Sequence, residues 1–178
     1  LLCYQRNQVW ASDIALWEDV AAKSPRNSRA HFQLGVAYYQ AGRCPDAARH
    51  YELAWKLGKP DYRLLLDWAL AEDCLNRPRQ ALEKLHQAAA MRRTGHVYAL
   101  IGMIHGRQKQ YAEALEALAT AEKIDPKEDM LYFYRGNVYA ATGESAGALE
   151  QYRRALALNP GNDMARRAIA RLQSRGAR

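Results

Sequence analysis

The sequence predicts an all-α protein in which antiparallel helix pairs stack into a solenoid. Apolar residues make up 49% of the 178 positions, Ala and Leu are abundant, and only 2 Phe occur. This composition favours helices over a β-sandwich. Small residues also recur at intervals of 33 or 34 positions. A helix pair of that length cannot bury its apolar face alone, so successive pairs are expected to stack.

Three registers of small side chains define the repeat. Alanines recur at separations of 34, 33 and 34 residues, a second alanine follows each by seven, and a glycine or alanine precedes each by twelve. We expect the preceding small residue and the first alanine to lie where the two helices of a pair cross, because small side chains let helix axes approach closely. The registers are Ala47, Ala81, Ala114 and Ala148; Ala54, Ala88, Ala121 and Ala155; and Gly35, Ala69, Gly102 and Gly136.

This pattern resembles the tetratricopeptide repeat (TPR) family, which implies a right-handed α-solenoid. The fourth unit carries the pattern most fully, with Tyr132, Gly136, Tyr139, Gly143, Ala148, Tyr152, Ala155 and Pro160. We expect one TPR domain over residues 1–178, with full repeats at 28–61, 62–94, 95–128 and 129–162. The second repeat has Glu72 and Asn76 where tyrosine and glycine are usual. It is also one residue short between Ala88 and Gly102, so this junction is the expected irregularity.

Both ends of the chain extend the pattern. Residues 1–27 are expected to form a partial repeat. The first helix of its pair would leave a remnant in residues 1–9, and the second would span residues 12–24, with Ser12 as its N-cap. Helically spaced apolar residues predict a capping helix over 162–174, within a capping helix and basic tail at 163–178. The arginines of this helix are expected on its outer side, in water; they are Arg166, Arg167, Arg171 and Arg175.

The positive charge of the chain is concentrated in that tail. The net charge is +7, and residues 153–178 hold seven Arg and one acid, which leaves +1 for the rest. Such a stripe would suit phosphate, an acidic protein or lipid headgroups, but solvation is the simpler interpretation and nucleic acid is a weak alternative. No run approaches the roughly 18 apolar residues of a membrane span, so no membrane insertion of this segment is expected.

Catalytic, metal and cofactor sites are not expected. The five histidines show no metal-binding spacing, and the glycines form no phosphate-binding loop. His31 and His105 occupy positions that usually hold packing aromatics, whereas His96 is expected on the inner side of its helix. The three cysteines are too few and too scattered to predict a disulfide framework, so no redox compartment follows.

The resemblance implies a concave groove lined by the first helix of each repeat, in which this family binds an extended or helical peptide. The competing interpretation is that the same residues pack in a tight superhelix. The clamp of Lys and Asn residues with which chaperone-binding members hold a C-terminal carboxylate is not expected, because Phe32 and Val36 stand where Lys and Asn are needed. The asparagine ladder of sugar-transferring members is also absent. The candidate groove residues are Arg29, Phe32, Val36, Tyr39, Arg63, Leu66, Leu70, His96, Met103, Arg107, Met130, Phe133 and Asn137.

The predicted function is therefore a non-catalytic scaffold that binds a protein or peptide, with self-association through an unpaired end as a further option. The segment from Leu1 to Val20 is also similar to the stretch after the last membrane span in polytopic proteins like the protein O-mannosyltransferases. That similarity implies a soluble C-terminal domain on the extracytoplasmic side, which would recruit acceptor proteins for a membrane glycosyltransferase. A free scaffold would instead be cytoplasmic, for example in a bacterium. The third alternative is an electrostatic nucleic-acid binder.

Overall fold

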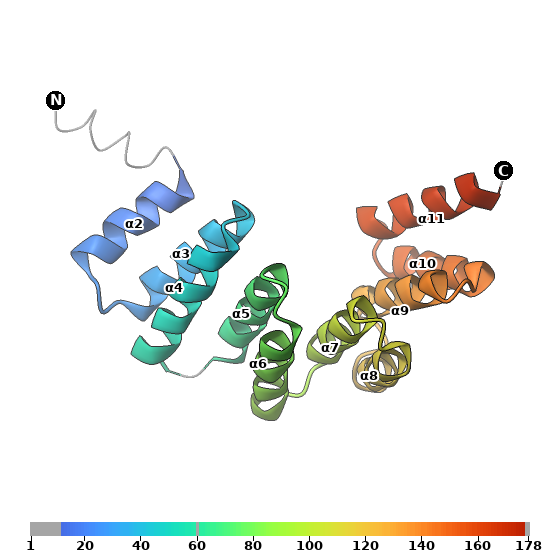
Figure 1. The fold of residues 1–178 in the computed structure, drawn as a ribbon, viewed down its shortest axis with the longest axis horizontal. Helices are drawn as coiled ribbons and strands as arrows, with labels where there is room; N and C mark the ends of the chain where they lie inside the picture. The colour runs from blue at the N-terminus through green and yellow to red at the C-terminus, as the bar shows by residue number, and fades with distance from the viewer. Residues whose placement is uncertain (1–11, 60, 177–178) are drawn as a thin grey trace. The chain divides into compact units, whose positions relative to one another are not determined.

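The computed structural model describes residues 12–59 and 61–176, and within these residues the fold consists of ten helices and no strand (Figure 1). Each of the four expected repeats contains one helix pair. The predicted helix over residues 1–9 lies outside the described residues. The helices are α2 (Asp13–Lys23), α3 (Ser28–Gln40), α4 (Cys44–Leu57), α5 (Tyr62–Cys74), α6 (Pro78–Met91), α7 (Gly95–Arg107), α8 (Tyr111–Ile124), α9 (Asp129–Ala141), α10 (Ser145–Leu158) and α11 (Asp163–Gly176).

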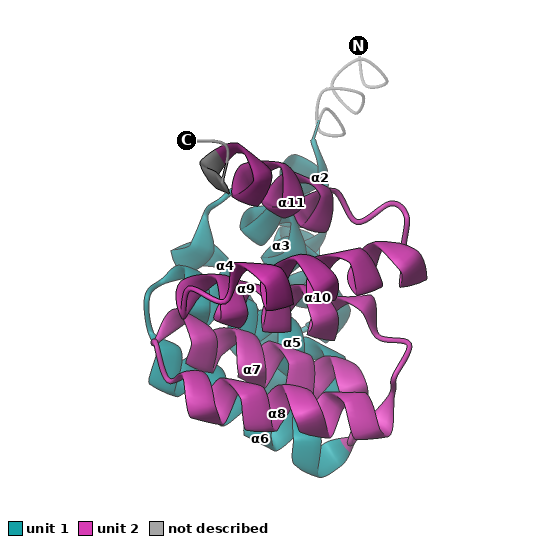
Figure 2. Cartoon of the chain, turned by 90° about the vertical axis from the view of Figure 1, so that its right-hand side faces the viewer, with its two compact units in different colours: residues 1–91 teal, residues 92–178 magenta. Residues whose placement is uncertain are grey.

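The chain divides into two compact units, residues 1–91 and residues 92–178, which Figure 2 colours separately. In unit 1, α3 packs against α4, α5 packs against α6, and α4 joins the two pairs through α5. In unit 2, α7 packs against α8 and α9 against α10, while α7 contacts α9 and α11 covers α10. The division falls at the junction where the repeat is one residue short. No helix of the described residues is both long enough and apolar enough to cross a bilayer.

The small residues of the repeat let the two helices of each pair approach closely, as predicted. A Cβ atom added to Gly35 would lie 2.7 Å from ring carbons of Tyr51, and one added to Gly136 would lie 2.5 Å from the ring of Tyr152. The corresponding neighbour of Gly102 is Leu118, at 2.6 Å. The side chain that covers each glycine is thus the fourth residue after the repeat alanine, rather than the alanine itself.

The turn between the helices of each pair needs a residue with positive φ. Gly42 and Gly143 supply it in the first and fourth repeats, with φ of 73° and 89°. Asn76 adopts φ of 56° in the second repeat and Lys109 adopts 60° in the third. Asparagine tolerates this region better than most residues, so the substitution noted in the sequence leaves the turn intact.

Both ends of the described chain are closed by the helices that the sequence predicts. The Ser12 side chain accepts a hydrogen bond from the amide of Ala15 at 3.2 Å, and so caps α2. At the other end, Asn162 accepts from the amide of Ala165 at 2.9 Å and caps α11. The apolar face of α11, with Ala168, Ile169 and Leu172, packs on the core of unit 2.

A disulfide between Cys44 and Cys74 corrects the expectation drawn from the scattered cysteines. Cys44 is the first residue of α4 and Cys74 the last of α5, and their Cα atoms lie 6.1 Å apart. Their sequence separation is 30, close to one repeat, and stacking brings positions about one repeat apart side by side. Sequence spacing alone does not reveal this pairing, because it depends on which helix ends meet.

The histidines differ in their environments. His31 is buried, as expected for a packing position, and its ring stacks on that of His50 with centroids 5.3 Å apart. The two Nδ1 atoms are 3.1 Å apart, and His31 Nε2 lies 3.0 Å from the carbonyl oxygen of Pro25. His105 is half-buried and contacts Gln110 Oε1 through Nδ1, at 2.9 Å.

Candidate functional site

The candidate groove residues of unit 1 are only partly available to a ligand. Leu66 is 8% exposed and belongs to the interior, which corrects its expected place on an open surface. Phe32, Val36 and Tyr39 are half-buried and pack against the core of the unit. Leu70 is also half-buried, whereas Arg29 and Arg63 are exposed. A cavity of about 320 Å³ does lie beside Arg29 and Phe32, and Lys59 and Asp61 also line it.

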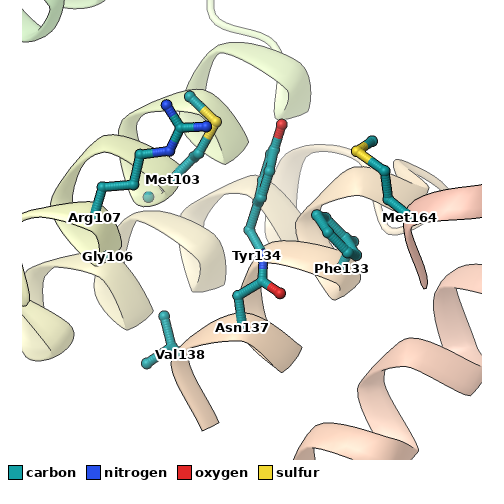
Figure 3. Close-up of a pocket in the computed structure, with 9 residues that line it drawn as sticks. Met103, Gly106, Arg107, Phe133, Tyr134, Asn137, Val138 and Met164 are labelled. Atoms are coloured by element: carbon teal, nitrogen blue, oxygen red, sulfur yellow. The ribbon is translucent and has the colours of Figure 1, made fainter. Parts of the chain in front are cut away.

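In unit 2, four candidate residues come together around one cavity of about 350 Å³ (Figure 3). Met103 and Arg107 project from α7, and Phe133 and Asn137 from α9. The remaining candidates of this unit lie elsewhere: His96 pairs with Glu128 at 3.3 Å, and Met130 Sδ accepts from Asn162 at 3.7 Å. Gly102, Gly106, Tyr134, Val138 and Met164 complete the lining.

A second cavity of about 350 Å³ adjoins the first. The two cavities share Phe133, Asn137 and Met164. The second one extends along α9 and α11, and its other lining residues are Ala140, Tyr152, Arg167, Ala168, Arg171 and Leu172. We call the two adjoining cavities together the unit 2 groove.

Helical spacing explains why these residues share one surface. Phe133, Asn137 and Ala140 follow one another at i, i+4 and i+7 on α9, so they form one face of that helix. On α11, Met164, Arg167 and Arg171 lie at i, i+3 and i+7, so they also share one face. The sequence points to the first set through the family pattern. For α11 the sequence predicts only the apolar positions that contact the core, of which Ala168 and Leu172 also line the second cavity.

The centre of the unit 2 groove is apolar. Phe133 packs against Tyr152 with ring centroids 5.8 Å apart and against Tyr134 at 5.6 Å. Met164 is 51% exposed, the most exposed large apolar side chain among the described residues. Figure 3 shows Met103 and Arg107 on one side of Tyr134 and Phe133 and Met164 on the other. An exposed apolar surface of this kind is suited to a partner with hydrophobic side chains.

One hydrogen bond orients the polar group at this centre. The Tyr152 hydroxyl donates to Asn137 Oδ1 at 2.8 Å. This hydrogen bond fixes the orientation of the amide and leaves its Nδ2 group to donate to a ligand. Burial raises the pKa of Tyr152, and the charge of Arg171 opposes that shift, so the hydroxyl remains a protonated donor near neutral pH. Asn137 can therefore donate to a main-chain carbonyl or a carboxylate.

The arginines of α11 do not form the uniform outer stripe that the sequence suggests. Arg167 and Arg171 are exposed, as expected, but they line the unit 2 groove. Arg166 behaves differently, because it pairs with Asp163 and donates to the carbonyl oxygen of Pro160 at 2.7 Å. The side chain of Arg175 lies outside the described residues.

Among the described residues, neither Glu72 nor the metal-binding residue types form a competing site. Glu72, which replaces the usual tyrosine, accepts from Trp68 Nε1 at 2.9 Å and lies 3.4 Å from Arg77, so it is a satisfied structural carboxylate. In the part of the chain that the structure describes, no group of three or more His, Cys, Asp or Glu could hold a metal ion.

Comparisons with known proteins match these repeats. The tetratricopeptide repeat family model matches residues 14–61, 66–129 and 99–163. The human protein O-mannosyl-transferase TMTC1 is 30% identical over 133 residues, which span 71% of this chain but 15% of that protein. The crystal structure of TTC0263, a thermophilic TPR protein in Thermus thermophilus, is 28% identical with a TM-score of 0.73, covering 82% of this chain and 81% of that one. The structure of YrrB, described as a TPR protein with an unusual peptide-binding site, has a TM-score of 0.65 at 21% identity and covers 94% of this chain and 86% of that one.

Proposed function

Because this chain belongs to the tetratricopeptide repeat family, we propose that it is a non-catalytic protein-interaction module that holds a peptide or helix in the unit 2 groove. The observation that carries this proposal is the pair of adjoining cavities that share Phe133, Asn137 and Met164. An extended peptide needs a continuous surface with apolar anchor sites and polar groups for its main chain, and the groove combines both.

The surroundings of the groove support this assignment. Asn137 offers a donor whose orientation is fixed by Tyr152, which limits the entropy lost on binding. Met103 and Met164 bring flexible, polarizable side chains that adapt to different apolar partners. YrrB, which has the same fold, is described as having a peptide-binding site.

Selection from a phage library of random peptides about 12 residues long, with the whole chain as bait, tests the proposal. Selected peptides are expected to bind in the micromolar range and to bind about tenfold more weakly to Met164→Ser, because this change removes an anchor contact from the groove. Phe133→Ala should have a similar effect, with its folding checked by circular dichroism because Phe133 also packs on Tyr152.

Leu158→Ser is the matched control. Leu158 is 40% exposed at the end of α10 and lines neither cavity of the groove, so its replacement should leave peptide binding unchanged. Peptides that bind wild type and Met164→Ser equally well would contradict the proposal.

A second candidate function is that of an accessory domain that recruits acceptor proteins for a membrane glycosyltransferase. The 30% identity to protein O-mannosyl-transferase TMTC1 favours it, as does the similarity of the segment from Leu1 to Val20. The disulfide between Cys44 and Cys74 fits an oxidising, extracytoplasmic environment. The coding sequence upstream of Leu1 tests this candidate: many apolar spans would support it, and their absence would contradict it.

A further inference from the structure

Two arginines on α11 stand beside the apolar centre of the unit 2 groove. Arg167 and Arg171 are four residues apart and line the same cavity as Phe133 and Asn137. Among the described residues, neither has a carboxylate within ion-pair distance, whereas the adjacent Arg166 pairs with Asp163. Folding of the unit therefore leaves these two guanidinium groups available to a ligand.

The rest of the groove adds donors and no opposing charge. None of the described residues that line its two cavities is an Asp or Glu. Asn137, whose amide oxygen accepts from Tyr152, lines the same cavity as Arg171 and offers its Nδ2 donor there. Arg107 from α7 also lines the first cavity, and Figure 3 shows it across Tyr134 from Phe133 and Met164. Carboxylates are the protein groups that best complement such a set, because guanidinium groups bind them through charge-assisted hydrogen bonds.

We propose that the groove selects an acidic peptide segment, in which an apolar side chain occupies the centre at Phe133 and Met164 and a neighbouring Asp or Glu binds Arg167 and Arg171. This inference rests on the proposed function and adds the class of partner to it. The role of α11 is then twofold, because it covers the core of unit 2 with one face and forms the basic wall of the groove with another.

A nucleic-acid strand fits this surface less well than a peptide. A strand needs cations all along its backbone, since each phosphate carries a charge. Much of the groove is instead lined by apolar side chains, among them Met103, Phe133 and Met164.

Three peptide libraries distinguish the inference from the proposed function. Each has a fixed central Leu or Phe, flanked at random by Asp and Glu in the first, by Asn and Gln in the second, and by Lys and Arg in the third. Selection on the wild-type chain is expected to enrich the first library about tenfold over the second. The peptides recovered should bind roughly tenfold more weakly to the Arg167→Gln/Arg171→Gln variant. Their affinity for wild type should also fall as salt is raised.

The matched control removes the same charge elsewhere. Arg79 on α6 and Arg153 on α10 are exposed and line neither cavity of the groove. An Arg79→Gln/Arg153→Gln variant should therefore retain full affinity. If it loses as much affinity as the α11 variant, the effect is one of net charge and the inference is wrong.

The remaining outcomes separate the two levels of the argument. Equal enrichment of the acidic and neutral libraries, with binding still lost in Met164→Ser, overturns the acidic selectivity and leaves the peptide groove standing. Failure of every library to yield a Met164-dependent peptide overturns both. A single-stranded RNA of about 12 nucleotides that binds more tightly than the acidic peptides, and depends equally on Arg167 and Arg171, also overturns the inference in favour of nucleic acid.

Discussion

The two units contain the same kind of helix pair, yet they use equivalent positions for different purposes. Phe32 packs on Tyr51 in unit 1 with centroids 6.0 Å apart, and Phe133 packs on Tyr152 in unit 2 at 5.8 Å. Beside the aromatic pair, unit 1 has the apolar Val36, whereas unit 2 has Asn137 at the same point of the repeat. The change from Val36 to Asn137 thus places an oriented hydrogen-bond donor beside the aromatic pair of unit 2.

The polar groups of the two units differ in the same sense. In unit 1 these groups contact one another: Cys44 and Cys74 form a disulfide, and His31 and His50 form a buried pair. Unit 2 instead presents Met164 and Arg171 along an open groove. The recurring small residues set the helix crossings in both units. The residues between them determine whether a unit gains internal contacts, as unit 1 does, or a groove for a partner, as unit 2 does.

The largest expected effect is confined to unit 1. Reduction of the disulfide, or Cys74→Ser, should lower the free energy of unfolding of this unit by about 3 kcal/mol, because a cross-link spanning a loop of this length restricts the unfolded chain. Hydrogen exchange followed by mass spectrometry on the whole chain resolves the units separately. Amides of α4 and α5 should exchange faster after reduction and those of α9 and α10 should not. Equal effects in both units would contradict the separation.

The helix crossing of unit 2 should be nearly as sensitive. Gly136→Leu is expected to cost about 1 to 3 kcal/mol, because the new side chain meets the ring of Tyr152 and forces the helices apart. Chemical denaturation monitored by circular dichroism measures the change. The control, Ala157→Leu, enlarges an exposed position of α10 and should have little effect. An unchanged midpoint for Gly136→Leu would show that the crossing is misassigned.

Acid should weaken unit 1 more than unit 2. Burial lowers the pKa of His50 to about 4, with Arg49 and His31 acting in the same direction and Asp46 and Glu18 opposing it; the ring of Tyr38 also packs against it, 5.4 Å away. Because the unfolded chain binds the proton near pH 6.5 and the folded chain only near pH 4, the stability of unit 1 is lost as the pH falls through this window.

The His50→Phe variant provides the comparison for this effect. It keeps an aromatic ring at the position but removes the titrating group, so the stability of unit 1 should depend less on pH between 6.5 and 5. Hydrogen exchange of α3 and α4 at the two pH values measures the difference. A pH dependence that is the same in wild type and variant would show that another group is responsible.

The smallest effect concerns the residue that distinguishes the two aromatic pairs. Asn137→Val introduces the side chain found at position 36 and removes the hydrogen bond from Tyr152, which should cost about 1 kcal/mol of stability. The same variant should bind selected peptides more weakly, since the groove loses its oriented donor. Titration calorimetry measures the affinity, and retention of full affinity would show that Asn137 takes no part in recognition.

The sequence predicts the parts of the molecule that repeat. Gly35, Gly102 and Gly136 recur with the period of the helix pairs, so their crossings follow from spacing alone, and Ser12 is predicted as an N-cap from its residue type. Asn162 is expected inside the last helix, whereas the structure shows it as the N-cap of that helix. The disulfide is not predicted in this way, because Cys44 and Cys74 do not recur at equivalent positions of the repeats. The basic wall of the groove is not predicted either, because the apolar spacing of α11 indicates only its contact with the core and says nothing of Arg167 and Arg171.

The methionine methyl groups test the location of the groove most directly. The chain has 4 Met: Met103 and Met164 line the unit 2 groove, whereas Met91 and Met130 do not. In methyl NMR spectra of the isotope-labelled chain, titration with the tightest peptide from the acidic library should shift the signals of Met103 and Met164 and leave those of Met91 and Met130 in place. Shifts confined to Met91 or Met130, or a peptide that binds without moving Met103 and Met164, would contradict the account.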